Sequence, residues 1–359
     1  MKVAIIGGGY AGFNLAHLLD PHVDVTLIEA REAFVHNVAA IRAIVEPGLL
    51  EKIVIPYDQL LKRGRVIRGR AVSIDRDRVN LADGSGIEAD EMIIATGSRY
   101  AAPFKPQGDN AIEQAQTLRD TARQVAAASQ IIIVGAGAVG VELAGEIKAK
   151  YPDKSVALVS EQARLFPMYP ANLHAKLLKR LSALKVALHL GQKASGLART
   201  DMPHVGETTL ADGTRLAGLI IPAIGARIAD SPAHDLPHID RKPNGQIGVD
   251  RWLRPSSLPN VFAIGDLAAT GEGMTVVATL RQTPWLAKTL RKMAGGKDIE
   301  SLPAYAPWKT APILLPLGPK KGASVLPVGQ GLVVGDGLTS AIKGKDLFIP
   351  RYRKEFGRS

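Results

Sequence analysis

The chain has no cysteine among its 359 residues. This absence excludes disulfide bridges, cysteine-ligated zinc or iron–sulfur centres and every mechanism that uses a thiol. No apolar run reaches the roughly 18 residues that a membrane-spanning helix needs. The apolar start of the chain is interrupted at residues 7–9, too early for the apolar region of a signal peptide, so we expect an intracellular, cytoplasmic protein.

Acidic side chains are fewer than basic ones. The chain has 34 Asp and Glu against 45 Lys and Arg, which gives a net charge of +11 and an isoelectric point near 9.7. Such a surplus favours anionic partners such as phosphorylated cofactors, acidic proteins or anionic lipid, although general solubility explains it equally well. At about 100–200 residues per domain, the length predicts two or three domains.

Two segments repeat one pattern, a short β-branched strand followed by G-x-G-x-x-G and then by a helix. The first copy occupies residues 3–16 and the second residues 131–144. In such a turn the first glycine allows a tight bend, the second lets the backbone approach a pyrophosphate, and the third lets the helix pack on the sheet. The phosphates then bind free N–H groups at the helix N-terminus. We interpret the two copies as two dinucleotide-binding sites.

The strand that follows each copy supplies a further candidate. Glu29 ends this strand in the first copy, where an acidic side chain hydrogen-bonds a ribose 2′-OH. The second copy has Ser160 there, followed by Glu161 and Arg164, so the choice between NADH and NADPH stays open. The candidate residues are Gly7, Gly8, Gly9, Tyr10, Ala11, Gly12, Glu29, Ala30 and Arg31 for the first site, and Gly135, Gly137, Ala138, Val139, Gly140, Glu161 and Gly225 for the second.

Two further strands end in recognisable motifs, Ala95-Thr96-Gly97 and Gly265-Asp266. With the two glycine-rich turns in this order, the chain resembles the two-dinucleotide-binding-domain flavoproteins, the glutathione reductase-like superfamily. The resemblance implies an α/β fold with two Rossmann-like domains and a small C-terminal domain. It also implies that the first turn and the A-T-G strand bind FAD, that Asp266 binds the flavin ribityl chain, and that the second turn binds NADH or NADPH as co-substrate.

The order of the motifs predicts how the domains divide the chain. We expect residues 1–108 and 245–295 to form the FAD-binding domain and residues 109–244 to form the NAD(P)H-binding domain. Residues 296–359 would form the C-terminal domain. Proline- and glycine-containing turns separate these pieces at residues 103–108 and 242–245.

A closer resemblance concerns two short stretches. Residues 34–43 resemble the F-x-H-N-x-A-A-x-R stretch of the ferroptosis suppressor protein 1 and AMID group, the apoptosis-inducing factor homologues, and residues 343–348 resemble its K-x-x-D-L-F segment. The resemblance implies hydride transfer from NAD(P)H to FAD and then reduction of a quinone, as in the related type II NADH dehydrogenases. The disulfide reductases of this superfamily need a cysteine pair, which this chain lacks.

The same resemblance implies roles for individual side chains. Glu142 would point toward the junction of nicotinamide and flavin, with a helix-dipole partner as the alternative. Lys343 would lie near the flavin ring in a charge-matching role, or else on the surface. Arg42 and His36 would contact the flavin region and Val72 the adenine. A solvated arginine, a structural histidine and an ordinary strand valine remain the alternatives.

The remaining features concern partners. The eight histidines have no metal-binding spacing, so we expect no metal site. The basic and apolar C-terminal tail, residues 343–358, suits peripheral docking at an anionic membrane, or a packed element with solvated charges. Nothing indicates a specific nucleic acid or an oligomeric state. Besides the quinone reductase, a reductase of an acidic ferredoxin-like carrier and a redox-sensing binding protein remain as alternative functions.

Overall fold

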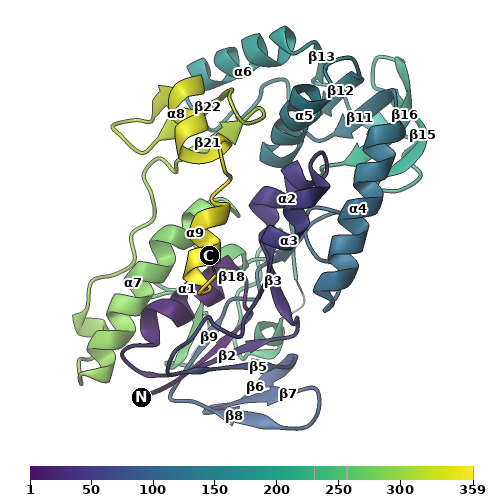
Figure 1. The fold of residues 1–359 in the computed structure, drawn as a ribbon. Helices are drawn as coiled ribbons and strands as arrows, with labels where there is room; N and C mark the ends of the chain where they lie inside the picture. Colours follow the sequence, from purple (N-terminus) through teal and green to yellow (C-terminus); the bar gives the residue numbers. More distant parts are fainter. Residues whose placement is uncertain (230, 256–257, 359) are drawn as a thin grey trace.

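The first sheet combines strands from two distant parts of the chain. In the computed structural model, which describes residues 1–229, 231–255 and 258–358, five parallel strands lie in the order β19-β9-β1-β2-β5 (Figure 1). Continuous β-branched and apolar runs suit strands that are buried on both faces. The strands are β1 (Lys2–Ile6), β2 (Asp24–Glu29), β5 (Arg65–Arg68), β9 (Glu91–Ile94) and β19 (Val261–Ala263).

Helices cover one face of this sheet and a small sheet covers the other. The helices are α1 (Tyr10–Leu19), α7 (Val276–Ala294) and α9 (Ile349–Glu355), and the core beneath them contains Phe13, Phe262 and Phe356, all fully buried. On the other face lie the antiparallel strands β6 (Ala71–Ile74), β7 (Arg78–Leu81) and β8 (Gly86–Glu88).

The second sheet is built around the second glycine-rich turn. Its order is β13-β12-β11-β16-β15-β14, in which the first four strands are parallel and the last two antiparallel. In both sheets the strand before the glycine-rich turn, β1 or β11, has parallel neighbours on both sides, and ligands bind at the carboxyl ends of such strands. The strands are β11 (Gln130–Val134), β12 (Ser155–Ser160), β13 (Val186–Leu190), β14 (Ala194–Ser195), β15 (His204–Leu210) and β16 (Arg215–Pro222), and the helices are α4 (Ala111–Ala127), α5 (Ala138–Lys150) and α6 (Ala171–Ala183).

The third sheet is antiparallel and small, with the order β21-β22-β23. A π-helical turn, Ser340–Gly344, follows it, and the chain then descends to α9, which lies beside α1 and α7 (Figure 1). A core that includes Ile41, Val141 and Leu315 joins α2 (Asn37–Ala43), α5 and this sheet. The elements of this part are β21 (Ile313–Pro316), β22 (Gly322–Leu326), β23 (Leu332–Val334) and α8 (Asp336–Thr339).

Shorter elements connect these sheets. The pair β10 and β17 is antiparallel and brings the segment after the A-T-G strand to the segment after β16. The others are the antiparallel pair of β3 and β4 and the parallel pair of β18 and β20. Their bounds are β3 (Ala33–Val35), β4 (Val54–Pro56), β10 (Ser98–Arg99), β17 (Arg227–Ile228), β18 (Ile247–Gly248) and β20 (Ala268–Ala269), with α2 (Asn37–Ala43), α3 (Leu50–Ile53) and 3₁₀ turns at Pro47–Leu49, Pro232–Asp235, Gly265–Leu267 and Ile299–Ser301.

The C-terminal tail differs from the membrane-docking expectation. Leu347, Ile349, Tyr352 and Phe356 are buried, and the last two pack into the core beneath α1 and α7. These side chains are therefore not free to enter a lipid surface, and the alternative of a packed tail describes them correctly. Across the described ranges, the structure contains no helix with the length and apolar character needed to cross a bilayer.

Candidate functional site

One cavity of about 460 Å³ extends from the carboxyl ends of the first sheet to α5 and the third sheet. Its wall brings together four stretches that the sequence singled out: the first glycine-rich turn, the A-T-G strand end, the G-D motif and the residues implied for catalysis. The expected site residues in its wall are Gly7, Gly9, Tyr10, Ala11, Glu29, Ala30, Arg31, Ala95, Thr96, Gly97, Ala138, Val139, Glu142, Gly265, Asp266 and Lys343.

Two glycines of each turn are required by packing. Gly7 and Gly135 have φ of +101° and +114°, in the region that favours glycine. A Cβ on Gly12 would lie 1.7 Å from the carbonyl oxygen of Gly7, and one on Gly140 would lie 1.9 Å from that of Gly135. These four glycines therefore let each helix pack against its own turn.

The middle glycine of each turn has a different role. Gly9 has φ −67° and ψ −172°, and Gly137 has φ −72° and ψ −173°, so any residue could adopt either conformation. A Cβ at either position would meet no protein atom within 4 Å. Neither backbone geometry nor protein packing requires these two glycines. The open space beside both backbones is compatible with the close approach of a dinucleotide pyrophosphate.

Glu29 fixes the first turn from the side. Its Oε2 accepts a hydrogen bond of 2.5 Å from the Gly8 N–H, and its Oε1 accepts one of 3.0 Å from Arg31 Nε. Tyr57 donates from its hydroxyl to the Gly8 carbonyl at 2.8 Å. The backbone of Gly8 is therefore held by Glu29 and Tyr57. Glu29 and Arg31 also line the cavity, at the position expected for a ribose.

Two residues of the cavity wall have buried polar atoms that lack partners. Thr96 Oγ1 and Asn37 Oδ1 are buried with no hydrogen-bond partner, and both residues line the cavity wall. An unsatisfied buried polar atom costs about 1–3 kcal/mol. A polar ligand such as FAD would remove this cost, so the two orphaned atoms support a cofactor at this place.

Asp266 belongs to a polar cluster that the sequence did not indicate. Its Oδ2 accepts hydrogen bonds from Ser98 Oγ at 2.5 Å and from Lys105 Nζ at 3.0 Å. Both partners follow the A-T-G strand and line the cavity. A signal was available, because a segment that leaves the carboxyl end of a parallel strand borders the ligand site.

Lys343 and Glu142 meet in the cavity wall from different elements. The Lys343 Nζ donates to Glu142 Oε1 at 2.7 Å and to the Leu314 carbonyl at 3.1 Å. Burial raises the pKa of Glu142 to about 7, against the opposing effect of the Lys343 charge. Burial therefore disfavours the charged Glu142 carboxylate, while the nearby Lys343 favours it.

Among the expected site residues that do not line the cavity are His36, Arg42 and Val72. His36 lies behind Tyr10, whose hydroxyl is 2.7 Å from His36 Nδ1, and burial lowers the pKa of His36 to about 4. Arg42 points away from the cavity and pairs with Glu146. Val72 is 45% exposed and faces solvent, while the preceding residues 69–71 line the cavity instead. For Val72 the reason is the alternation of side chains along β6.

The second turn borders this cavity through Ala138 and Val139, whereas its three glycines do not line it. Glu161 and Gly225 are exposed at the carboxyl ends of β12 and β16. The Gln162 N–H donates to Ser160 Oγ at 3.1 Å, so the Ser160 side chain is engaged in a local turn. Glu161, the next residue after β12, is the acidic side chain that follows the end of this strand most closely in sequence.

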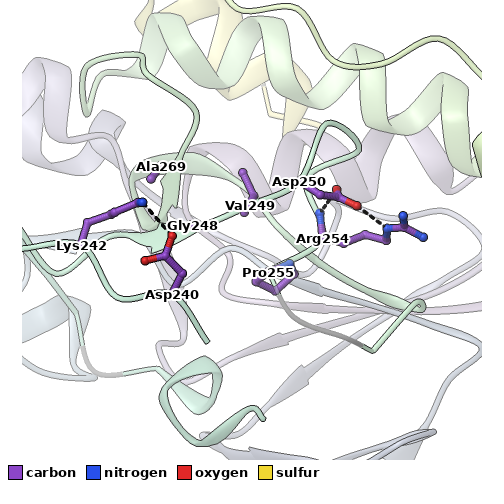
Figure 2. Close-up of a pocket in the computed structure, with 8 residues that line it drawn as sticks. All are labelled: Asp240, Lys242, Gly248, Val249, Asp250, Arg254, Pro255 and Ala269. Carbon is purple, nitrogen blue, oxygen red and sulfur yellow. Dashed lines mark hydrogen bonds and ion pairs between the residues drawn. The ribbon is translucent and has the colours of Figure 1, made fainter. Parts of the chain in front are cut away.

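A second hollow is lined by paired charges (Figure 2). Lys242 Nζ lies 2.7 Å from Asp240 Oδ2, and Arg254 Nε lies 2.7 Å from Asp250 Oδ2. The hollow holds none of the expected site residues. We assign no chemistry to it.

The two turns, the cavity between them and the orphaned polar atoms define a flavoprotein with two dinucleotide-binding domains, an FAD-dependent NAD(P)H oxidoreductase. The model of the pyridine nucleotide-disulphide oxidoreductase family matches residues 1–285, and the chain belongs to this family. It has no cysteine, so a disulphide is not part of its own chemistry. The α/β class with two Rossmann-like domains is confirmed.

Similar proteins extend over nearly the whole chain. Apoptosis-inducing factor homolog B of Dictyostelium discoideum is 32% identical over 98% of this chain and 95% of its own length. The human ferroptosis suppressor protein 1 is 31% identical over 97% of this chain and 94% of its own. The structure of the sulfide:quinone oxidoreductase of Aquifex aeolicus superposes with a TM-score of 0.75 at 17% identity, covering 99% of this chain and 92% of that one. The resemblance to the apoptosis-inducing factor homologues is thereby confirmed.

Proposed function

We propose that this protein is an NAD(P)H:quinone oxidoreductase that uses FAD and no thiol relay. One observation carries the proposal: the Glu142–Lys343 pair lies in the wall of the same cavity that the first glycine-rich turn opens. The resemblance to the ferroptosis suppressor protein 1 group, which implied quinone reduction from the sequence, supports this choice of acceptor.

The proposal assigns each part of the chain a task. Residues 1–108 and 245–295 hold FAD, residues 109–244 hold NAD(P)H, and residues 296–359 supply Lys343. FAD, when bound, would supply the redox chemistry that links hydride transfer from NAD(P)H to two-electron reduction of the acceptor. The chain would provide the orientation: the backbone of Gly9 and Gly137 would admit the pyrophosphates, and Asp266, with Ser98 and Lys105 beside it, would hold the ribityl chain.

The Glu142–Lys343 pair handles charge and a proton. Quinone reduction consumes one proton beyond the hydride, because NAD(P)H, H⁺ and quinone give NAD(P)⁺ and quinol. Glu142, with its pKa of about 7, holds a proton at its carboxyl in part of the molecules at neutral pH. Lys343 Nζ keeps a positive charge in the cavity wall, where transferred negative charge is stabilised.

The apolar part of the wall favours a small apolar acceptor. Ile313 and Leu314 of β21 and the nearby Pro312 line the cavity, and the Leu314 carbonyl accepts from Lys343 Nζ. The residues Val276, Val277 and Leu280 of α7 continue this lining. A quinone ring seated on such a surface would have its oxygens within reach of the charged pair.

Anaerobic titration of the FAD-loaded protein with NADH and with NADPH, followed by ubiquinone-1 or menadione, tests the proposal. We expect the flavin absorbance to bleach with one or both donors and to return when the quinone is added. Protein that binds no FAD, or that does not bleach, overturns the assigned chemistry. Bleached protein that no quinone re-oxidises overturns the acceptor alone.

A second candidate is a reductase of an acidic ferredoxin-like carrier, which the net charge of +11 favours. It predicts cytochrome c reduction that depends on added ferredoxin and falls steeply with ionic strength, together with weak quinone turnover. Strong quinone turnover without a carrier contradicts it.

A further inference from the structure

Two stretches that the sequence marked separately hold each other in the structure. Arg42 Nη2 donates to the Gly344 carbonyl at 2.6 Å and Nη1 to the Lys345 carbonyl at 3.3 Å. His36 Nε2 lies 2.7 Å from the Leu347 carbonyl. The carbonyls of residues 344, 345 and 347 thus all bond to side chains at the beginning and end of α2.

The guanidinium of Arg42 is anchored a second time. Its Nε donates to Glu146 Oε2 at 3.0 Å and its Nη2 to Glu146 Oε1 at 2.8 Å, and both side chains are at least 95% buried. One side chain of α2 therefore joins α5 of the second sheet to the turn that follows the third sheet. Only the planar fork of arginine makes such a two-sided contact, because lysine has a single point of attachment.

The turn that carries Lys343 needs such support. It is a π-helical turn, and Leu347 and Phe348 after it have φ of +53° and +63°. Left-handed residues other than glycine are costly and persist where the surroundings hold them. The carbonyls at the end of a helical segment also lack partners within the segment. The side chains of His36, just before α2, and of Arg42, within it, donate to these carbonyls and hold the left-handed residues in place.

We propose that Arg42 and His36 are positioning residues that hold the 344–347 backbone and thereby keep Lys343 Nζ at Glu142. Arg42 does not line the cavity, so the proposal assigns it to the turn and not to the flavin. The proposal rests on the function proposed above, because the place of Lys343 matters only if the cavity conducts the reaction. His36 serves this purpose as a neutral imidazole, with its Nε2–H donating to Leu347 and its Nδ1 accepting from Tyr10.

The first test uses the absence of cysteine. Lys343→Cys gives a chain with a single thiol, and its rate of reaction with a thiol reagent reports how well the turn is held, without FAD or catalysis. We expect slow labelling in this background, since the Lys343 side chain is only 11% exposed. Adding Arg42→Met should raise the rate about tenfold, which corresponds to ~1.4 kcal/mol of lost anchoring.

Two further variants keep this test decisive if Arg42→Met folds poorly. Arg42→Met combined with Glu146→Met removes both buried charges, a replacement that stability often tolerates. Arg123→Met is the matched control, because Arg123 is 72% exposed on α4 and pairs with its neighbour Asp120. Faster labelling in the double variant and no change in the control support the proposal. Unchanged labelling in the double variant overturns it.

The second test separates positioning from cofactor binding. Arg42→Met should retain FAD at the parent stoichiometry, while NADH bleaches the flavin about tenfold more slowly. In the Lys343→Met background the same substitution should cost less than about twofold, because the interaction that it perturbs is already gone. Loss of FAD in Arg42→Met, or costs that simply add, overturns the proposal. A parent protein that NADH does not bleach refutes the proposed function instead, and the labelling result then stands alone.

Discussion

Lys343 Nζ and Glu142 Oε1 lie 2.7 Å apart although 201 residues separate them in the chain. The contact joins the π-helical turn after the third sheet to the helix that follows the second glycine-rich turn. It places a cation and a carboxyl of raised pKa in the wall of one cavity. The charge of the site therefore depends on pH near neutrality.

This dependence gives the first prediction. As the pH rises from 6 to 8, Glu142 loses its proton and neutralises Lys343, so we expect NADH to bleach the flavin several-fold more slowly. Glu142→Gln should remove this dependence. Stopped-flow measurement of the visible flavin absorbance gives the rate at each pH. Glu207→Gln, at an exposed glutamate of β15, is the control, and a pH profile that persists in Glu142→Gln would contradict the assignment.

His36 gives a prediction about stability. Its pKa in the folded protein is about 4 against an ordinary value of 6.5. Between these values the unfolded chain binds a proton that the folded chain does not, so the free energy of unfolding falls as the pH falls. From pH 6.5 to pH 5 we expect a loss of about 1.5–2 kcal/mol from this group.

Urea unfolding at several pH values measures this loss. His36→Gln should be less stable at pH 7, because it disturbs the bonds to Tyr10 and Leu347, but its stability should fall less between pH 6.5 and 5. His22→Gln, at an exposed histidine, should keep the parent profile. If His36→Gln shows the same fall as the parent, His36 is not the group responsible.

The second glycine-rich turn offers a matched pair of substitutions. Gly137→Ala adds a Cβ that meets no protein atom, so we expect an unchanged melting temperature and FAD content. Its KM for NADH should rise by about tenfold or more, since the Cβ occupies the approach of the pyrophosphate. Gly140→Ala should instead cost about 2–4 kcal/mol of stability, because its Cβ would lie 1.9 Å from the Gly135 carbonyl oxygen. Equal damage to folding in both variants would refute the distinction.

The choice of nucleotide donor depends on the end of β12. Glu161 is exposed beside Ser160, and its carboxylate would repel the 2′-phosphate of NADPH. We therefore expect a preference for NADH, and about a tenfold shift of the kcat/KM ratio toward NADPH in Glu161→Ser, with Arg164 retained. Steady-state kinetics with both donors measure the ratio. Glu207→Ser should leave it unchanged, and a shift in that control would point to general electrostatics.

Local patterns were sufficient for part of this site. The glycine-rich turns, the A-T-G strand end and the G-D motif were readable because each is a short segment whose backbone geometry demands particular residues. Sixteen of the expected residues line one cavity. Ser98 and Lys105 were missed because their importance comes from Asp266, which lies more than 160 residues away.

Other features show what a local sequence pattern does not reveal. Arg42 was marked by its motif, but no pattern within residues 34–43 could indicate that its partners are Glu146 and the backbone at 344 and 345. The apolar tail could equally have met lipid or protein. It is buried because Tyr352 and Phe356 pack with side chains of α1 and α7 over the first sheet.

The amino-acid sequence alone determined the two nucleotide-binding turns and excluded a thiol, because both depend on residue types within short stretches of chain. Only the tertiary structure decided that Glu142 faces Lys343, that Arg42 holds the turn beside it, and that the tail is buried. These are contacts between distant segments. Their free energy comes from packing and from close pairing of buried charges, which offsets the cost of desolvation and exists only once the three sheets have come together.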